Sequence, residues 1–258
     1  MTRMTDSADG ALAGQTALVT GASRGIGLAI AKSLARRGAR LVLTARKAEP
    51  LTEAVAGFGG AGTAVAQPGN VADQAHREQA VRTAVDTFGS LDLLVANVGI
   101  NPIYGPLMTA DLDAFRKILD TNVVSTLALI QQAWRAWMAD HGGAVLIVAS
   151  VAGMRASEGI AAYGVSKAAL INLTTQLAVE LGPRVRVNAI APAVVKTKFA
   201  QALYENREDE AGRIYPAGRF GLPEDAGEAA AYLLGPAASW VTGQTLVLDG
   251  GALARGPV

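Results

Sequence analysis

The sequence predicts an α/β fold, a doubly wound sheet of about seven parallel strands with helices on both faces. Short runs rich in β-branched residues alternate with longer segments of helical spacing along the chain. Two of the short runs, Leu93-Leu94-Val95-Ala96 and Val145-Leu146-Ile147-Val148, are continuously apolar, which is typical of parallel strands buried on both faces. A chain of 258 residues that is 50% hydrophobic can enclose this sheet in one domain.

The predicted elements follow this alternation in order. Strands are expected at residues 16–20, 40–44, 63–67, 91–97, 144–150, 185–191 and 245–249, and helices at 26–37, 73–88, 112–139, 163–181 and 223–234. Gly38, Gly89 and Gly182 follow three of the helices, as expected for glycine at a helix end. Residues 196–219 interrupt the pattern and are polar. They are interpreted either as a flap that covers a substrate or as a solvated helix over the sheet edge.

Composition excludes several classes of protein. A formal net charge of +1 without a cluster of Lys and Arg gives no reason to expect a nucleic-acid partner. The chain has no cysteine, which excludes disulfides and thiolate nucleophiles and is compatible with the predicted cytoplasmic location. No metal site is expected, because no convincing His/Asp/Glu cluster is apparent. Residues 1–13 lack an apolar region and are expected to be a disordered leader before a single domain at 14–258, without a membrane span.

A glycine-rich stretch lies between the first predicted strand and the first predicted helix. It reads Gly21-Ala22-Ser23-Arg24-Gly25-Ile26-Gly27. Glycines permit a tight turn and let backbone N–H groups at the helix N-terminus approach a pyrophosphate, so these residues are candidate dinucleotide ligands. The spacing differs from GxGxxG, and a tight strand-to-helix connection without a ligand is the alternative.

The end of the second predicted strand favours NADP(H) over NAD(H) as cofactor. NAD sites usually place an acidic residue there to bind the ribose hydroxyls, but this chain has Leu43-Thr44-Ala45-Arg46. Arg24 and Arg46 are candidates to bind a 2′-phosphate. The alternative is that Arg46 caps a second helix and Arg24 is a surface residue, and NAD(H) then stays possible.

Tyr163 and Lys167 are the first candidate catalytic residues. Their separation places both side chains on one face of the predicted helix. An ammonium group beside a phenol favours the phenolate, so we expect Lys167, together with an oxidised nicotinamide, to lower the pKa of Tyr163 from about 10 toward neutrality. Tyr163 would then exchange a proton with a carbonyl oxygen. A surface Tyr-Lys pair is the alternative.

Ser150 and Asn122 complete the candidate set. Ser150 ends the fifth predicted strand, where open α/β sheets bind ligands, and its hydroxyl could bind a substrate oxygen or merely cap the next loop. Asn122 lies in the middle of a predicted helix, where an amide has poor intrinsic propensity. It has either a functional role or a structural polar contact.

These motifs together resemble the short-chain dehydrogenase/reductase family, of the classical type with a Rossmann-type fold. The resemblance covers residues 14–251. Beyond the glycine loop and the Tyr163/Lys167 pair, it extends to three more motifs in the family's order. These are Ala96-Asn97-Val98-Gly99, Asn188-Ala189-Ile190-Ala191-Pro192, and Thr242-Gly243-Gln244 with Asp249-Gly250-Gly251.

The resemblance implies roles for particular residues. Asn122, Ser150, Tyr163 and Lys167 would be catalytic, with Lys167 also holding the nicotinamide ribose and Asn122 supporting a proton relay through water. The implied cofactor-binding residues are Gly21, Ser23, Arg24, Gly25, Ile26, Gly27, Arg46, Asn70, Val71, Asn97, Gly99, Tyr163, Lys167, Pro192, Val195 and Thr197.

Four positions depart from the family pattern. Asn70 stands where an aspartate usually contacts adenine, and it can still accept and donate hydrogen bonds. Ala96 and Val98 replace an asparagine and an alanine in the fourth-strand motif. Ala193 replaces a glycine, so it would narrow the nicotinamide site or require a different backbone angle.

The predicted function is therefore NADP(H)-dependent hydride transfer between a carbonyl and a secondary alcohol. The resemblance extends to 3-oxoacyl-acyl carrier protein reductases and to broad carbonyl reductases. Alternatives are an NAD-dependent alcohol dehydrogenase and a dinucleotide-binding protein without turnover. A serine hydrolase is disfavoured, because His76 and His141 are interpreted as surface residues and no GxSxG motif is present.

The resemblance also implies self-association, as a homotetramer or a homodimer. The predicted helices at 112–139 and 163–181 are the candidate interface elements. Trp134 and Trp137 are candidate interface anchors, with packing against the core or the surface as the alternative.

Overall fold

The computed structural model describes residues 10–255, and in this range seven parallel strands form one sheet of order β3-β2-β1-β4-β5-β6-β7. The strands are β1 (Thr16–Thr20), β2 (Arg40–Ala45), β3 (Ala64–Pro68), β4 (Leu93–Ala96), β5 (Gly143–Val148), β6 (Val185–Pro192) and β7 (Thr245–Leu248). The order reverses between β1 and β4, and a crevice outside the strand C-termini at such a point is where open α/β sheets bind ligands.

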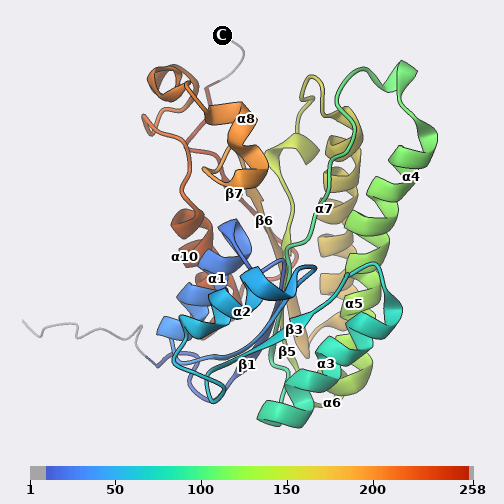
Figure 1. Ribbon diagram of the computed structural model, residues 1–258, viewed down its shortest axis with the longest axis vertical. Coiled ribbons are helices and arrows are strands. Elements are labelled where there is room, and N and C mark those ends of the chain that lie inside the picture. The colour runs from blue at the N-terminus through green and yellow to red at the C-terminus, as the bar shows by residue number, and fades with distance from the viewer. Residues whose placement is uncertain (1–9, 256–258) are drawn as a thin grey trace, which may run out of the picture.

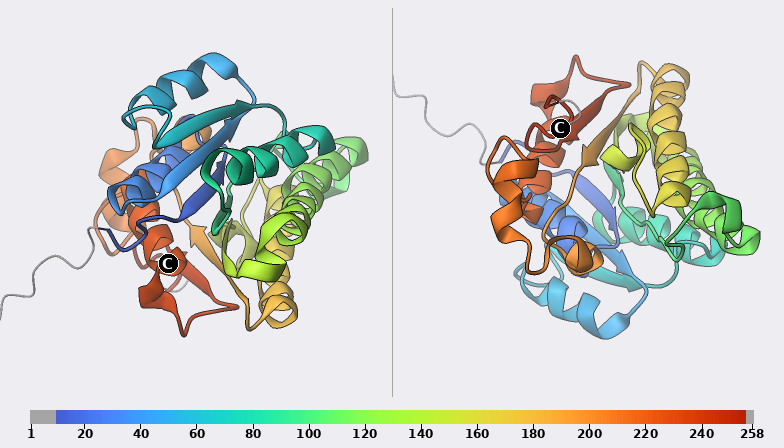
Figure 2. Two further views of the ribbon diagram at one scale, coloured as in Figure 1. Left: turned by 90° about the horizontal axis from the view of Figure 1, so that it is seen from below. Right: turned by 90° about the horizontal axis from the view of Figure 1, so that it is seen from above.

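Helices cover both faces of the sheet (Figures 1 and 2). They are α1 (Gly25–Arg36), α2 (Ala48–Ala56), α3 (Gln74–Phe88), α4 (Leu112–Leu119), α5 (Ser125–Ala133), α6 (Ala139–His141), α7 (Ala161–Leu181), α8 (Gln201–Tyr204), α9 (Ala211–Ile214) and α10 (Pro223–Leu234). Helices α1, α2 and α10 lie on one face, and α3, α5 and α7 lie on the other (Figure 1). The predicted doubly wound architecture is confirmed.

Two apolar cores follow from this layering, one on each side of the sheet. Every residue of β1 is buried, and its side chains alternate between the cores because successive residues of a strand point to opposite faces. Ala17 and Val19 belong to the core under α1 and α10, whereas Leu18 belongs to the core under α3, α5 and α7. This double burial explains the continuously apolar strand sequences.

The predicted helix at 112–139 is wrong in one respect. It is interrupted by two π-helical segments, Asp120–Val124 and Trp134–Met138, which separate α4, α5 and α6. In the first segment, the hydroxyl of Ser125 donates to the carbonyl of Asp120 at 2.9 Å. Each π turn adds a residue to the helix without ending it, so the apolar spacing of the sequence does not reveal it.

Several boundaries also differ from the predictions: β4 and β5 are shorter at their C-terminal ends, so Ser150 lies two residues beyond β5. Helix α2 had no predicted range, although a second helix after Arg46 was considered. Residues 1–9 of the predicted leader lie outside the described residues, but residues 10–13 form turns, and Leu12 is fully buried, with its N–H donating to Arg37 at 2.8 Å. The packed domain thus begins before the predicted boundary at residue 14. Within residues 10–255, no helix has the length and hydropathy to cross a bilayer.

The segment at 196–219 is a series of short helical turns that include α8 and α9. Its two ends are held together by a bridge between Val195 and Gly221. Tyr215 and Phe220 are buried with Ala252 in a small apolar cluster, so this part of the chain is more than a solvated helix. Figure 1 places the segment at the upper end of the molecule, beside the loops that follow β4 and β5.

Helices α1 and α10 pack against each other at Gly227. A Cβ atom at this position would lie 2.8 Å from the carbonyl oxygen of Ala29, closer than real side chains approach backbone. We expect Gly227→Val to lower the free energy of unfolding by about 1–3 kcal/mol, because the helices must separate to admit the side chain. A denaturant titration measures this, with Gly62→Val as control, because a Cβ at Gly62 would meet no atom within 4 Å. Equal stability of the two variants would contradict the prediction.

Candidate active site

The glycine-rich loop runs from β1 into α1 at the C-terminal edge of the sheet. The N–H of Ala22 donates to the carbonyl of Thr44 at 3.0 Å, which ties the loop to the end of β2. Gly21 and Gly25 have φ angles of 64° and 58°, a region that favours glycine. No side chain caps the N-terminus of α1 at Arg24, so its first backbone N–H groups can serve an anion.

At Gly27, on the inner side of this loop, there is no room for a side chain. A Cβ at Gly27 would lie 2.5 Å from the carbonyl oxygen of Gly21 and 2.7 Å from Nδ2 of Asn97. Asn97 holds this arrangement by donating from Nδ2 to the carbonyl of Thr20 at 2.9 Å. The result is a cradle of the kind that lets a pyrophosphate approach backbone closely, so the predicted residues Gly21, Gly27 and Asn97 fit a dinucleotide.

Two arginines lie beside the cradle. Arg24 precedes α1 and Arg46 follows β2, and the pairing of Thr20 with Thr44 places these two strand ends side by side. Both arginines are exposed, and within the described residues neither has an ion pair or a side-chain hydrogen bond. They are available for a bound anion.

The loop after β3 contains Asn70 and Val71. Oδ1 of Asn70 accepts a hydrogen bond from the N–H of Ala72 at 3.2 Å, and the carbonyl of Val71 accepts one from Arg77 at 2.7 Å. His76 packs beside this loop and is 8% exposed, so its interpretation as a surface residue is wrong. Its ring fills the space that a side chain at position 69 would need, where the chain has glycine.

Ser150, Tyr163 and Lys167 meet where β5 ends. Ser150 caps the turn after β5, with Oγ accepting from the N–H of Ala152 at 3.2 Å and donating to the carbonyl of Pro192 at 3.4 Å, and the same side chain acts on the pKa of Tyr163. Lys167 lies one turn along α7 from Tyr163 and is 2% exposed. Its ammonium donates to the carbonyl of Val148 at 2.7 Å and lies 5.3 Å from the centre of the Tyr163 ring.

Burial controls the charge of both groups. It raises the pKa of Tyr163 to about 12, and the Ser150 hydrogen bond offsets only part of this effect. Burial also lowers the pKa of Lys167 to about 8. In the chain by itself, burial therefore dominates the pKa of Tyr163, and the predicted lowering by Lys167 together with an oxidised nicotinamide stays a prediction. Tyr163 holds its proton near neutral pH.

Asn122 is fully buried and lies in the first π-helical segment. Its Oδ1 accepts from the N–H of Ile100 at 2.8 Å, and its Nδ2 donates to the carbonyl of Ile100 at 3.1 Å and to Ser166 at 3.0 Å. The side chain therefore connects the loop after β4 to α7, and the predicted alternative of a structural contact describes what it does.

Ser166 is a buried residue beside the site that the sequence analysis did not single out. Its hydroxyl donates to the carbonyl of Tyr163 at 2.7 Å while accepting from Asn122, and the residue is fully buried. The sequence could have pointed to Ser166, because a polar residue directly before Lys167 lies within the predicted helix that carries Tyr163.

The chain after β6 closes the site. Pro192 ends β6, Val195 is 5% exposed, and Thr197 lies across the glycine loop, with its methyl 3.2 Å from where a Cβ at Gly25 would be. Ala193 does not have the positive φ angle that a glycine would permit at this position. Among non-glycine residues in the described range, only Asn206 has a positive φ.

Gly99 leaves space between the cradle and α7. A Cβ at this position would lie 3.2 Å from the ammonium of Lys167 and 3.8 Å from Oδ1 of Asn122. The loops after β1, β4, β5 and β6 thus bring the predicted cofactor residues and the predicted catalytic residues to one edge of the sheet.

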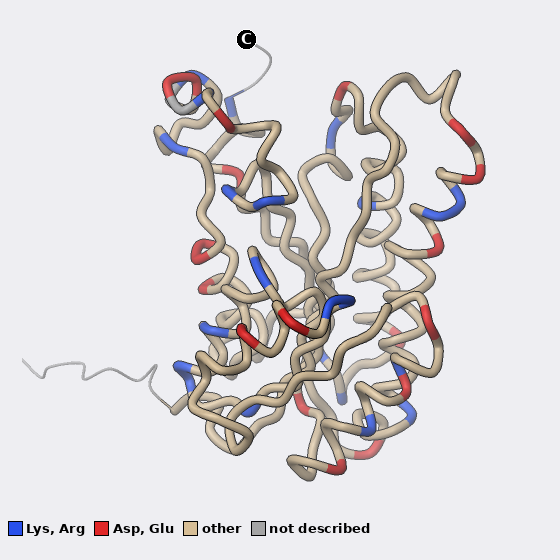
Figure 3. Tube along the Cα trace, in the orientation of Figure 1, with Lys and Arg blue, Asp and Glu red and all other residues tan. Residues whose placement is uncertain are grey.

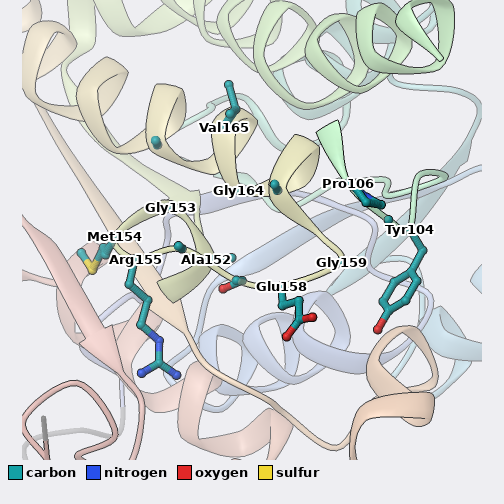
Figure 4. Close-up of a pocket in the computed structure, with 15 residues that line it drawn as sticks. Tyr104, Pro106, Ala152, Gly153, Met154, Arg155, Glu158, Gly159, Gly164 and Val165 are labelled. Atoms are coloured by element: carbon teal, nitrogen blue, oxygen red, sulfur yellow. The ribbon is translucent and has the colours of Figure 1, made fainter. Parts of the chain in front are cut away.

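One cavity borders the outer side of α7. It has a volume of about 930 Å³ and is bordered by the loop at residues 104–106, the loop at 152–159 and the outer side of α7 (Figure 4). Within the described residues, its lining includes Gly164 and Val165 but none of the four predicted catalytic residues. The cavity therefore adjoins the predicted catalytic residues without being lined by any of them.

Comparisons with known proteins agree with this geometry. A family model described as enoyl-(acyl carrier protein) reductase matches residues 21–252. Dehydrogenase/reductase SDR family member 4 of Oryctolagus cuniculus is 40% identical over 249 residues, covering 95% of this chain and 95% of that protein. The Homo sapiens protein of the same name is 38% identical, covering 95% of this chain and 89% of its own.

Solved structures give the same result. A short-chain dehydrogenase/reductase described as glucose/ribitol dehydrogenase, from Brucella melitensis, has a TM-score of 0.89 at 30% identity, covering 95% of this chain and 98% of that chain. A short-chain type dehydrogenase/reductase from Mycobacterium ulcerans has a TM-score of 0.88 at 31% identity, covering 94% of this chain and 91% of that chain. The chain belongs to the classical short-chain dehydrogenase/reductase family and is an oxidoreductase that uses a nicotinamide dinucleotide.

Proposed function

We propose that the protein is an NADP(H)-dependent reductase that interconverts a ketone and a secondary alcohol, with Tyr163 as the proton donor and acceptor. The observation that carries this proposal is the meeting of Ser150, Tyr163 and Lys167 opposite the glycine cradle. The Ser150 side chain is near enough to act on the pKa of Tyr163, and the Lys167 ammonium lies 5.3 Å from the centre of the Tyr163 ring.

The cofactor would extend along the strand ends from β3 to β6. Gly21, Ser23, Gly25, Ile26 and Gly27 would hold the pyrophosphate through backbone N–H groups at the start of α1. The remaining contacts would come from Asn70 and Val71 at the adenine, Asn97 and Gly99 at the centre, Tyr163 and Lys167 at the ribose, and Pro192, Val195 and Thr197 at the nicotinamide. When bound, the nicotinamide supplies or accepts the hydride.

The chain's own groups would manage the proton. With a pKa raised to about 12, Tyr163 is a neutral phenol at physiological pH and can donate to the oxygen of a carbonyl held by Ser150. Lys167 stabilises the phenolate left behind, because its ammonium adjoins the ring. Asn122 is a positioning residue, since its side chain is committed to Ile100 and Ser166, and any relay water would have to use its neighbours.

Preference for NADP(H) is supported by the charges beside the cradle. No carboxylate follows β2 to repel a 2′-phosphate, because the chain there reads Ala45-Arg46-Lys47. Arg24 and Arg46 are exposed and available on adjacent strand ends. Two guanidinium groups suit phosphate recognition because each can donate two parallel hydrogen bonds.

A panel of carbonyl compounds tests the activity. NADPH and NADH would each be mixed with simple ketones, diketones and a 3-oxoacyl thioester, and the nicotinamide absorbance followed. We expect NADPH oxidation with at least one ketone or diketone. Turnover of the thioester alone would favour the acyl carrier protein reductase alternative, and binding of NADPH without any turnover would favour a non-catalytic protein.

Self-association and cytoplasmic location stay predictions. Trp134 and Trp137, the candidate interface anchors, pack against the core under α3, α5 and α7. Trp137 also stacks on His141 with ring centroids 3.7 Å apart. These contacts favour the packing alternative for both tryptophans.

Replacing Tyr163 by phenylalanine removes only the proton-exchanging oxygen. We expect Tyr163→Phe to lower kcat by about 10²–10⁴-fold, the usual contribution of a general acid, while NADPH affinity measured by fluorescence titration stays within about twofold. Retention of wild-type turnover would show that another group donates the proton.

Replacing Arg24 and Arg46 together by alanine tests the cofactor preference. We expect the KM for NADPH to rise at least about tenfold, because a hydrogen bond to a charged group contributes about 1.5–3 kcal/mol, and the KM for NADH to stay the same. Lys32→Ala is the matched control, because Lys32 is an exposed cation elsewhere on α1. An unchanged NADPH/NADH ratio in the double variant would exclude the assignment.

The charge of Lys167 gives a pH-dependent signature. Its pKa of about 8 in the folded chain lies below its ordinary value of 10.5, so between these values the unfolded chain binds more protons. Stability from this residue should therefore increase with pH across that window. Denaturant titrations of the wild type and of Lys167→Met measure this. From pH 8 to 10, we expect the free energy of unfolding of the wild type to rise relative to that of the variant. A pH-independent difference would contradict the burial argument.

A further inference from the structure

The structure leaves one large apolar ring exposed beside the proposed proton donor. Phe199 has 64% of its surface exposed, and its ring centre lies 6.2 Å from that of Tyr163. The two rings are tilted by 43°, within the range of favourable aromatic contacts. The remainder of the Phe199 ring faces open space at the site, although an aromatic side chain gains most from burial.

Two contacts of Thr197 hold the turn that carries Phe199 in place. Thr197, two residues earlier, lies across the glycine loop, with its methyl 3.2 Å from the position of a Cβ on Gly25. The Thr197 hydroxyl also accepts a hydrogen bond from the N–H of Ala200 at 3.3 Å and so caps the short turn that carries Phe199. The turn that carries Phe199 therefore lies beside the cofactor cradle, and the ring itself lies beside Tyr163.

The loops after β4 and β5, which line the cavity beside α7, are also held in place and partly apolar. Gly105 donates to the carbonyl of Gly159 at 2.9 Å, which joins the loop after β4 to the loop after β5. The ring of Tyr104, 81% exposed, lies against Gly159, where a Cβ would come within 2.7 Å of it. Figure 4 shows Tyr104 extending from this junction.

The charged side chains on these loops do not favour a substrate of either sign. Arg155 and Glu158 lie on the same loop and are both exposed, with opposite sign (Figure 4). Lysines, arginines and acidic residues are interspersed at this end of the molecule (Figure 3). The exposed feature specific to the site is thus its apolar surface.

We propose that Phe199 is a specificity-determining residue whose ring forms the wall against the larger, apolar substituent of the carbonyl substrate. The protein would prefer ketones and diketones with an aryl or other bulky apolar group over small ones. Substrate binding would then bury the exposed part of the ring, which accounts for its exposure in the structure. This inference rests on the proposed carbonyl reduction.

The test compares two diketones that differ in one substituent, 2,3-butanedione and 1-phenyl-1,2-propanedione, with NADPH as cofactor. We expect Phe199→Ala to lower kcat/KM for the phenyl compound at least about tenfold, mainly through KM, since one apolar contact in a pocket discriminates about 10–200-fold. The kcat/KM for butanedione should change by less than about twofold. Phe199→Leu should recover most of the loss.

Two controls separate this role from a structural one. Trp240→Ala removes an aromatic side chain that is 99% exposed and precedes β7, away from the strand C-termini, and it should alter neither substrate. NADPH affinity of Phe199→Ala, measured by fluorescence titration, should match the wild type. A rise in its dissociation constant would overturn the proposal, because Phe199 would then support the cofactor site.

The remaining outcomes separate the two proposals. An equal loss for both diketones, or no loss for either, would overturn the role of Phe199 while leaving carbonyl reduction intact. Wild-type turnover of butanedione without turnover of the phenyl compound would do the same. Absence of wild-type turnover with every carbonyl tested would overturn carbonyl reduction itself, and the specificity proposal with it.

Discussion

A parallel sheet buried on both faces is the constraint on which the rest of this structure depends. Parallel neighbours need a crossover connection, so every strand ends at the same edge and every connecting helix must pack on a face. The loops after β1, β4, β5 and β6 consequently converge, although the residues they carry are far apart in the chain. The cradle of Gly21 and Gly27 and the pair Tyr163 and Lys167 meet for this reason.

Hydrogen bonds from two side-chain amides then fix the positions of the loops at this edge of the sheet. Asn97 joins β4 to the glycine loop, and Asn122 joins the loop after β4 to Ser166 on α7. A buried amide without partners would be costly, and here each side-chain hydrogen bond connects separate elements. These contacts hold Tyr163 relative to the cradle, so positioning and stability depend on the same bonds.

The same burial decides the protonation of the site. Removing water raises the pKa of Tyr163 to about 12 and lowers that of Lys167 to about 8, so near neutral pH Tyr163 is a neutral phenol while Lys167 still carries its charge. A neutral phenol is the form needed to protonate a carbonyl. The segment after β6 adds the outer wall, with Thr197 over the cradle and Phe199 beside the phenol.

Local sequence patterns are enough to predict the layered fold and a strand at each of the seven observed positions, and they single out the glycine loop and the pair Tyr163 and Lys167 as candidate site residues. These signals are local: apolar runs mark buried strands, glycines mark the cradle, and a four-residue spacing places Tyr163 and Lys167 on one helix face. Only the tertiary structure decided the π-helical turn at Asn122, the partners of Ser166, the direction of the Tyr163 pKa and the position of Phe199. Each of these depends on atoms from distant parts of the chain, whose approach no local spacing encodes.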